Sequence, residues 1–394
     1  MMKSYELKNI AEQYGTPCFV FDLEAVKNRV RAMKEIVNGS FRLCYSIKAN
    51  PFLIPAMEEV LDHLEVCSPG ELTICESLHV KPEAIVYSGV SKTPADIAEA
   101  IDYGAGIFTA ESIHQLELVS ETAVKTNADV PVLLRLSAGS QFGMSKEDIH
   151  YILSHPELYP GTHIEGLHYF VGTQRKKLDQ QRKELLMLKE FFEELRNTYG
   201  LPLAKLEYGP GLGVPLFEGD DFSDTLSPLK ELLDDLKAVT EWAELTVESG
   251  RFIATECGYY LTKVMDTKRS FDTNYAILDG GINHVNYLGA MMGMKHPILE
   301  RFAANEKLGN VQDWCLCGSL CTTNDILIRK ISFDSLEQGD ILAFENIGAY
   351  SVTEGIHLFL SRTMPRIVLR DEEGKYRLGR DYIETSGLNT LQSY

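Results

Sequence analysis

The chain has 394 residues, 44% of them hydrophobic, and its 57 Asp and Glu residues exceed its 38 Lys and Arg residues, giving a net charge of −19. This length favours two domains, and the negative charge argues against nucleic acid or an anionic membrane as a partner. Its eight cysteines are scattered, and no apolar run is long enough for a signal peptide or a membrane span. We therefore expect a cytoplasmic protein with reduced thiols.

Between residues 24 and 250, short apolar runs alternate with amphipathic stretches. The eight runs are Leu43–Ile47, Leu64–Cys67, Ala84–Tyr87, Gly106–Thr109, Val132–Leu136, Ile164–Val171, Lys205–Tyr208 and Leu245–Val247. Helical patterns such as Leu23–Met33, Pro94–Tyr103 and Lys176–Tyr199 separate them. Eight strand–helix units in about 230 residues predict an α/β fold, the (β/α)8 TIM barrel, with a doubly wound open sheet as the alternative. A barrel gathers functional residues just after the C-terminal ends of its strands.

Lys48 ends the first of these runs, in the segment Cys44-Tyr45-Ser46-Ile47-Lys48-Ala49-Asn50. A strand environment desolvates an ammonium group, so we expect a lowered pKa and an amine that forms a Schiff base with an aldehyde. The aldehyde that suits such a lysine is pyridoxal 5'-phosphate, which also needs a phosphate-binding loop and a carboxylate at its ring nitrogen. The alternative is a lysine that extends from the strand end into water.

Two later segments supply those requirements. The turn Gly209-Pro210-Gly211-Leu212-Gly213 follows the seventh run, where barrels often bind phosphate through backbone N–H groups. Glu248-Ser249-Gly250-Arg251 follows the eighth run. Glu248 can pair with a protonated pyridine nitrogen, and Arg251 can reach a phosphate. A plain loop and a Glu–Arg salt bridge are the corresponding structural alternatives.

Beyond Arg251 the helical pattern fades, and a separate β domain is expected. Its strand-like runs are Tyr260–Val264, Tyr275–Leu278, Ile326–Ile331, Ile341–Phe344 and His357–Leu360. Cys315, Cys317 and Cys321 cluster there, but a zinc site would need a second ligand pair, so no metal is expected. We interpret Cys315 and Cys317 as buried strand residues.

Further segments in the same order complete a resemblance. They are Tyr14–Asp22, Glu65–Glu71, Gly166–Gln174, Gly318–Asp325 and Gly348-Ala349-Tyr350. With the segments above, they make the chain similar, nearly end to end, to the fold-type III pyridoxal-phosphate-dependent decarboxylases of diaminopimelate, ornithine and arginine. The resemblance implies an alanine-racemase-like barrel over residues 23–253 and a C-terminal β-barrel or β-sandwich domain over residues 1–22 plus 254–394. It also implies a head-to-tail homodimer in which the β domain completes the active site.

The resemblance also assigns roles to individual positions. Lys48 matches the Schiff-base lysine, and Cys321 matches the thiol that acts over the substrate Cα from the other subunit. The positions that match cofactor-binding residues are Glu65, Phe170, Thr173, Gly209, Gly211, Gly213, Glu248, Arg251 and Tyr350. Those that match substrate-binding residues are Thr322, Asp325 and Tyr350. Glu71 matches a second acidic position behind Glu65.

Two positions depart from the family pattern. Phe170 stands where relatives place a histidine on the cofactor ring, and we interpret the nearby His168 as a packed core residue. Thr322 stands where relatives that act on diamino acids carry an acidic residue for the distal ammonium, and Asp325 is expected to replace it only in part. These features resemble a divergent branch used in secondary metabolism.

The predicted activity is therefore removal of the α-carboxylate of an amino acid whose distal end is modified or tethered to a carrier protein. Diaminopimelate decarboxylation is the alternative, and a catalytically silent, decarboxylase-like binding protein is the non-enzyme alternative. An amino-acid racemase and a phosphate-binding barrel without the cofactor fit the motifs less well. Lys176, Lys177 and Arg182 offer a basic patch for an acidic carrier, although we interpret them as a solvated helix face.

Overall fold

The structure is a computed structural model that describes residues 2–57, 59–200, 204–287, 295–305 and 309–392. The chain divides into two compact units. The first comprises Met1–Asn28, Pro215–Ser223 and Ala254–Tyr394, and the second comprises Arg29–Val214 and Asp224–Ile253. Both chain termini therefore belong to the same unit.

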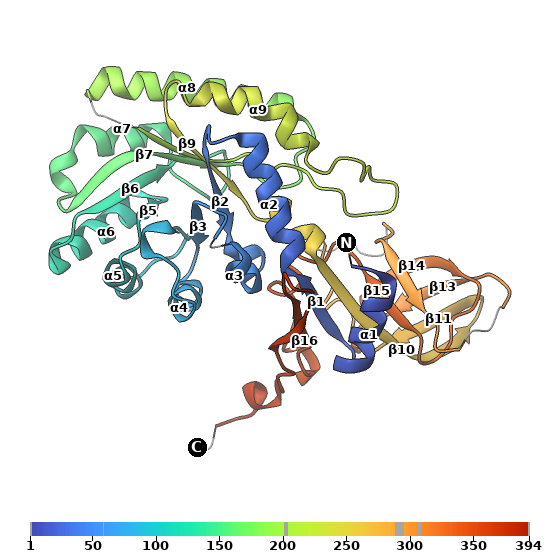
Figure 1. Ribbon diagram of the computed structural model, residues 1–394. Coiled ribbons are helices and arrows are strands. Elements are labelled where there is room, and N and C mark those ends of the chain that lie inside the picture. Colours follow the sequence, from blue (N-terminus) through green and yellow to red (C-terminus); the bar gives the residue numbers. More distant parts are fainter. Residues whose placement is uncertain (1, 58, 201–203, 288–294, 306–308, 393–394) are drawn as a thin grey trace. The chain divides into compact units, whose positions relative to one another are not determined.

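Eight parallel strands close into a barrel in the second unit (Figure 1). They are β2 (Arg42–Ser46), β3 (His63–Val66), β4 (Ile85–Tyr87), β5 (Ile107–Ala110), β6 (Val130–Arg135), β7 (Thr162–Phe170), β8 (Lys205–Gly209) and β9 (Glu244–Ser249). Each strand pairs with the next in chain order, and β9 returns to β2, where Cys44 lies opposite Glu248. The predicted (β/α)8 barrel is thus confirmed, and the open sheet is excluded.

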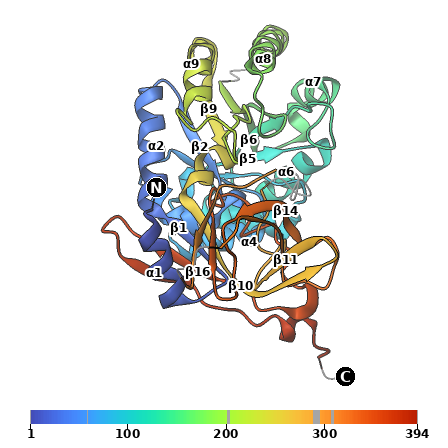
Figure 2. The ribbon, with the colours of Figure 1, turned by 90° about the vertical axis from the view of Figure 1, so that its right-hand side faces the viewer.

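Helices follow most of these strands and cover the outside of the barrel. They are α2 (Leu23–Val37), α3 (Ile54–Met57), α4 (Pro69–Ser77), α5 (Pro94–Tyr103), α6 (Ile113–Thr126), α7 (Lys146–Ser154), α8 (Leu178–Tyr199), α9 (Ser227–Val239) and α10 (Arg251–Ala254). Figures 1 and 2 show α8 and α9 side by side. Residues of the barrel interior such as Cys44, Val86, Ile107 and Leu133 form one buried cluster.

Local sequence signals set where the helices after β3, β4 and β5 begin. The side chains of Ser68, Thr93 and Ser112 each accept a hydrogen bond from a backbone N–H in the first turn of α4, α5 and α6. Proline at the first position of α4 and of α5 adds a pre-set backbone angle. These caps keep the strand-to-helix loops short, so the residues that end each strand stay at the rim of the barrel.

The first unit contains a nine-stranded sheet. Its strands are β1 (Cys18–Asp22), β10 (Gly258–Ser270), β11 (Thr273–Leu278), β12 (Leu299–Phe302), β13 (Gln312–Cys317), β14 (Ile326–Phe333), β15 (Ile341–Phe344), β16 (Arg366–Arg370) and β17 (Tyr376–Arg380). Strand β1 is fully buried between antiparallel β10 and parallel β16. Helix α1 (Ser4–Tyr14) packs Leu7 and Ile10 into the same core.

One predicted strand is wrong. His357–Leu360 forms no strand, because Phe359–Ser361 makes a short 3-10 turn in which Leu360 has a left-handed φ of 60°. The chain there is apolar but exposed, so its composition alone resembled a buried strand. Strands β12 and β17 were not predicted, because most of their residues are partly buried or exposed and form no apolar run. Among the described residues, no helix is both long and apolar enough to cross a lipid bilayer.

Candidate active site

The predicted site residues of the barrel lie where its strands end. Lys48 lies in the 3-10 turn Ile47–Ala49 directly after β2, and Glu65 is the third residue of β3. Phe170 and Gly209 are the last residues of β7 and β8, and Glu248 is the second-last residue of β9. Parallel strands bring these C-terminal ends to one rim, so residues 200 positions apart in sequence become neighbours.

The Lys48 ammonium lies among acidic groups. Its Nζ atom is 2.7 Å from Glu65 Oε2, 3.4 Å from Cys67 Sγ and 3.8 Å from Glu248 Oε1. Burial is the largest single influence and lowers the Lys48 pKa, but Glu65, Cys67 and Glu248 together outweigh it and hold that pKa well above its usual value. The expectation of a lowered pKa is therefore wrong for the protein without a cofactor.

Glu248 is the most heavily engaged carboxylate of this rim. Ser46 Oγ donates to Glu248 Oε1 at 2.7 Å, and His168 Nε2 lies 3.0 Å from Glu248 Oε2. Burial raises the Glu248 pKa, but Lys48 and His168 overcome this effect and lower it below the usual range. Glu248 is thus held as an anion, which is the state that a protonated pyridine nitrogen requires of its partner.

His168 is buried, as a core residue would be, but it also contacts the site. Its side chain is only 2% exposed, and its Nδ1 atom has no hydrogen-bond partner among the described residues. Sequence reasoning missed this contact with Glu248, although alternation along β7 could have placed residue 168 inside the barrel with Gly166 and Phe170 on the same side.

His168, Glu65 and Glu248 also form a group with metal-ligand chemistry. One ligand atom from each residue lies within 4.8 Å of the others. Lys48 Nζ, however, lies 2.7 Å from Glu65 and 3.8 Å from Glu248. A divalent cation at this point would face an ammonium group, so the lysine itself balances the two negative charges.

A third buried carboxyl group, Glu207 on β8, was not anticipated. Burial first, and then the neighbouring Glu248 and Glu65 carboxylates, raise the Glu207 pKa well above its usual value. Its Oε1 atom has no hydrogen-bond partner in the described part of the chain. Glu207 therefore keeps its proton, and Glu65 and Glu248 carry the negative charge that faces Lys48.

The turn after β8 requires glycine because neighbouring atoms lie too close to leave room for a Cβ atom. A Cβ atom on Gly209 would lie 2.3 Å from Cδ2 of Phe170, and one on Gly211 would lie 1.8 Å from the backbone oxygen of Gly172. Gly211 also has a left-handed φ of 62°. Only glycine allows this path, and it leaves backbone N–H groups uncovered by side chains, as phosphate binding requires.

These barrel residues fit pyridoxal phosphate. Lys48 offers a primary amine, Glu248 offers a buried anionic carboxylate for a pyridinium nitrogen, and the Gly209–Gly213 turn offers a backbone cradle that any Cβ at Gly211 would fill. Arg251 begins α10 just after β9, and Thr173 lies in the loop after β7. Phe170 supplies an apolar ring at the end of β7 where a histidine was expected from the family.

The remaining predicted residues belong to the first unit. Cys321 is an exposed free thiol in the loop that joins β13 to β14, and Tyr350 follows β15 with a left-handed φ of 68°. Thr322 is half-buried, and its Oγ1 atom accepts a 3.3 Å hydrogen bond from Asn324 N.

Asp325 does not present a free carboxylate. Its Oδ1 accepts a 2.9 Å hydrogen bond from Ile282 N, its Oδ2 accepts a 2.7 Å bond from Leu320 N, and the residue is 3% exposed. One oxygen thus holds the backbone of the 320–325 loop, and the other holds the backbone at Ile282. This geometry argues against the expected contact between Asp325 and a substrate ammonium.

Part of the positive charge of the predicted basic patch near α8 is neutralised by neighbouring carboxylates. Arg182 pairs with Asp179 at 2.8 Å and with Asp235 at 3.0 Å, so its charge is balanced by two carboxylates. Lys176 and Lys177 are exposed just before the helix. The interpretation of these residues as a solvated helix face agrees with this arrangement better than a docking patch does.

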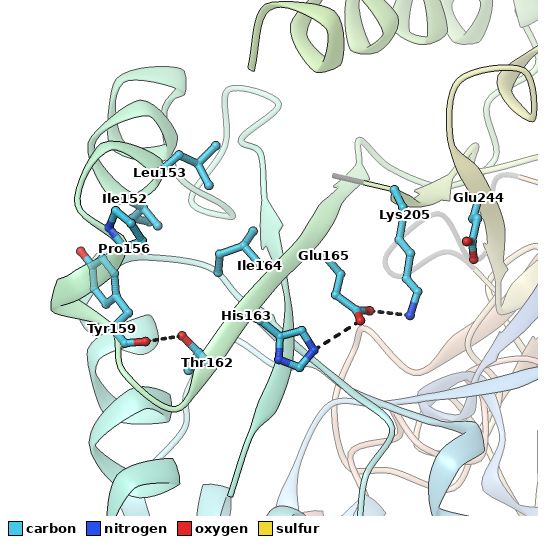
Figure 3. Close-up of a pocket in the computed structure, with 11 residues that line it drawn as sticks. Ile152, Leu153, Pro156, Tyr159, Thr162, His163, Ile164, Glu165, Lys205 and Glu244 are labelled. Carbon is cyan, nitrogen blue, oxygen red and sulfur yellow. Dashed lines mark hydrogen bonds and ion pairs between the residues drawn. The ribbon is translucent and has the colours of Figure 1, made fainter. Parts of the chain in front are cut away.

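A cavity of 480 Å³ lies at the opposite, N-terminal end of β7, β8 and β9. Figure 3 shows Glu165 between Lys205 and His163, with ion pairs to both. The apolar wall comes from residues such as Ile152 and Tyr159. None of the predicted site residues lines this cavity, so it is separate from the rim that carries Lys48.

Known proteins resemble the chain over nearly its whole length. Residues 23–255 match the family described as "Pyridoxal-dependent decarboxylase, pyridoxal binding domain". Diaminopimelate decarboxylase of Aquifex aeolicus is 25% identical over 98% of this chain and 95% of its own length. The crystal structure of diaminopimelate decarboxylase from Methanocaldococcus jannaschii, 25% identical, superposes with a TM-score of 0.85 over 96% of this chain and 92% of that one.

Two further relatives have more elaborate substrates in their names. The 2-[(L-alanin-3-ylcarbamoyl)methyl]-2-hydroxybutanedioate decarboxylase of Staphylococcus aureus is 27% identical over 91% of this chain and 95% of its own length. The L-glutamyl-[BtrI acyl-carrier protein] decarboxylase of Niallia circulans is 25% identical over 95% of this chain and 93% of its own length.

Proposed function

The chain belongs to the family of pyridoxal-dependent decarboxylases, and from this premise we propose that its substrate is an amino acid with a modified or carrier-tethered distal end. The reaction class, loss of an amino-acid carboxylate as CO2 with pyridoxal phosphate as cofactor, follows from the family and from its relatives. The substrate proposal depends on the 320–325 loop, in which Thr322 is neutral and Asp325 is occupied by the backbone.

Within the barrel we assign one task to each residue that faces the cofactor. Bound pyridoxal phosphate supplies an aldehyde and an aromatic ring that accepts the electron pair left by the departing carboxylate. Lys48 holds the cofactor through its amine, and Glu65 receives the ammonium when the amine is released. Glu248, anionic and fixed by Ser46 and His168, stabilises a proton on the ring nitrogen.

We further propose that the glycine turn and Arg251 bind the phosphate, and that Cys321 donates the proton that replaces the carboxylate at the substrate Cα. An exposed, free thiol is suited to this task because it can reach a substrate and its S–H group can donate a proton. Following the family, we propose a homodimer in which Cys321 serves the site of the partner subunit.

The substrate class follows from charge compensation. A diamino acid would bring a distal ammonium, and a desolvated ammonium without a carboxylate partner costs about 3 kcal/mol or more. Thr322 offers only a hydroxyl group, and both oxygens of Asp325 already accept backbone hydrogen bonds. An amide-linked or carrier-linked distal end, as the names of two relatives describe for their own substrates, avoids that cost.

Diaminopimelate decarboxylation is the second candidate, because relatives that cover 98% of the chain carry that name. The two candidates differ in the distal group, so CO2 release distinguishes them. Purified enzyme loaded with pyridoxal phosphate would be offered diaminopimelate, ornithine, lysine, arginine, and amino acids acylated at the distal end or bound to a carrier protein. We expect turnover only in the acylated or carrier-bound class.

A charge substitution sharpens this test. Thr322→Asp should introduce measurable turnover of a diamino acid because it supplies the missing carboxylate, whereas Thr323→Asp, with the same charge one residue away, should not. Rapid turnover of diaminopimelate by the unmodified enzyme would refute the substrate proposal. Light scattering on the active enzyme, with a molar mass twice that of one chain, would support the homodimer.

A further inference from the structure

Strand β13 carries two thiols that face each other. Cys315 Sγ and Cys317 Sγ are 3.7 Å apart, and both cysteines are free. Cys315 is 5% exposed, whereas Cys317 is half-buried and thus reachable from solvent. Neither thiol contributes to the proposed reaction, so their approach has no explanation in the decarboxylase chemistry.

Cys315 and Cys317 are two residues apart in β13, so their side chains lie on the same face of the strand. Residues two apart in a regular strand are separated by about 6.6–6.8 Å. The pairing of β13 with β11 is regular through Cys315 and Cys317, and the register shifts beside Leu316 occur in its pairing with β14. The two sulfur atoms have only about 1.7 Å further to move to reach the length of a disulfide bond.

We propose that Cys315 and Cys317 are a redox modification site that closes to a reversible disulfide within β13. The oxidant is a small-molecule disulfide. The Cys317 thiolate attacks one of its sulfur atoms and expels a thiolate, and the Cys315 thiolate then attacks the Cys317 sulfur and expels the second. The two protein thiols are oxidised to a disulfide, and the external disulfide is reduced to two thiols, which take up the two protons that the protein thiols lose.

The surroundings set the rate of that exchange. Burial is the largest influence and raises the Cys317 pKa, and Cys315 and Asp325 raise it further. Lys268 lowers it slightly, and the resulting pKa is about 12. The thiolate is therefore scarce at neutral pH and becomes more abundant as the pH rises. A disulfide ring of three residues, Cys315 to Cys317, in a strand is also strained, and strained disulfides are easily reduced again.

The site borders the loop that carries Cys321 and Thr322, so its effect on activity depends on the proposed function. Gly318, directly after Cys317, donates its N–H to Asp325 O at 3.0 Å. A Cβ atom on Gly318 would lie 2.3 Å from the Asp325 carboxylate, which shows how closely the two segments pack. Because these two segments pack so closely, we expect the formation of the Cys315–Cys317 bond to displace the loop.

Mass spectrometry of the full-length protein tests the proposal. Reduced holoenzyme would be treated with oxidised glutathione over a range of pH, then alkylated and digested with trypsin. The tryptic peptide of residues 308–329 contains Cys315, Cys317 and Cys321. We expect this peptide to lose two hydrogen atoms and to keep one alkylation site, on Cys321, and we expect faster closure at higher pH.

Matched variants assign the bond. Cys315→Ser and Cys317→Ser should each abolish the loss of two hydrogen atoms, whereas Cys75→Ser, a buried cysteine of the barrel unit, should not. In Cys321→Ser, the oxidised peptide should carry no alkyl group. Full alkylation of all three cysteines, a bond from Cys317 to Cys321, or glutathione retained on Cys317 would each overturn the proposal.

The expected displacement of the loop that carries Cys321 can be measured separately. The rate at which Cys321 is alkylated should change when the disulfide forms and return on reduction, and an unchanged rate would overturn the coupling. Neither this rate nor the peptide mass depends on turnover, so both results stand even if the substrate proposal fails. Where turnover is found, oxidation should lower it reversibly in the unaltered enzyme and leave Cys315→Ser unaffected.

Discussion

The position of Lys48 in the fold could be predicted from the sequence, but its pKa is set by residues of other strands. The pattern of an apolar run that ends in lysine correctly indicated a position at the end of the first barrel strand. The direction of its pKa shift was wrong, because Glu65 and Glu248 come from other strands and were not weighed against burial. The amine is therefore protonated until the cofactor or a nearby charge changes that balance.

Removing one of these charges should make the amine easier to deprotonate. In Glu65→Gln the pKa of Lys48 falls, because burial still favours the neutral amine and one of the stabilising carboxylates is gone. A lower pKa leaves more free amine at a given pH. We therefore expect the pH profile for covalent attachment of added pyridoxal phosphate to move to lower pH by about 1–3 units.

The attachment rate, followed by absorbance in protein stripped of cofactor, provides the measurement. Glu83→Gln, an exposed carboxylate outside the rim, controls for the loss of one negative charge from the protein. A profile of Glu65→Gln that coincides with the control, or that moves to higher pH, would show that Glu65 does not hold the ammonium.

At the scale of elements, the pair β7 and β8 determines the path of the glycine turn. Phe170 and Gly209 lie opposite each other at the ends of these strands, and the Phe170 ring occupies the space that a Cβ at position 209 would need. At Gly211 the obstacle is the backbone oxygen of Gly172 instead. The two glycines are therefore required for different reasons, one by a side chain and the other by the backbone.

This difference predicts which substitution can be rescued. Gly209→Ala should lower the free energy of unfolding by about 1–3 kcal/mol, and most of that cost should vanish in a Phe170→Ala background, a coupling of about 1 kcal/mol or more. Gly211→Ala should show no such rescue. Gly213→Ala, where the nearest atom is 3.4 Å away on the flexible Lys176 side chain, should cost less than about 0.5 kcal/mol.

Urea unfolding of the four single variants and the two double variants completes this cycle. Equal costs for Gly209→Ala with and without the Phe170 ring would show that the ring does not determine the glycine. Such a result would leave the backbone of β8 as the cause.

At the scale of the whole molecule, the first unit is assembled from both ends of the chain. Strand β1 pairs with β10 on one side and with β16 on the other, and every one of its five residues is buried. Among the described residues, no other strand pairs with the backbone groups of β10 and β16 that face β1. The N-terminal residues are thus part of the core of this unit.

Deleting residues 1–22 should therefore damage the far C-terminal part of the chain. We expect the truncated protein to aggregate and its residues 254–394 to be cleaved faster in limited proteolysis, because two strand edges become exposed. A deletion of residues 390–394 serves as the control and should leave the pattern unchanged. Unaltered cleavage of residues 254–394 after the N-terminal deletion would contradict this account of the sheet.

The sequence alone determined the barrel, its strand count, and the strand ends that hold Lys48, the glycine turn and Glu248, because these features have short periods and local turn signals. Tertiary structure decided the contact of His168 with Glu248, the proton held by Glu207, the engagement of Asp325 by the backbone, and the turn at residues 359–361. Each of these depends on groups brought together from distant segments. Charge and hydrogen bonding act through distances in space, and a sequence pattern specifies only distances along the chain.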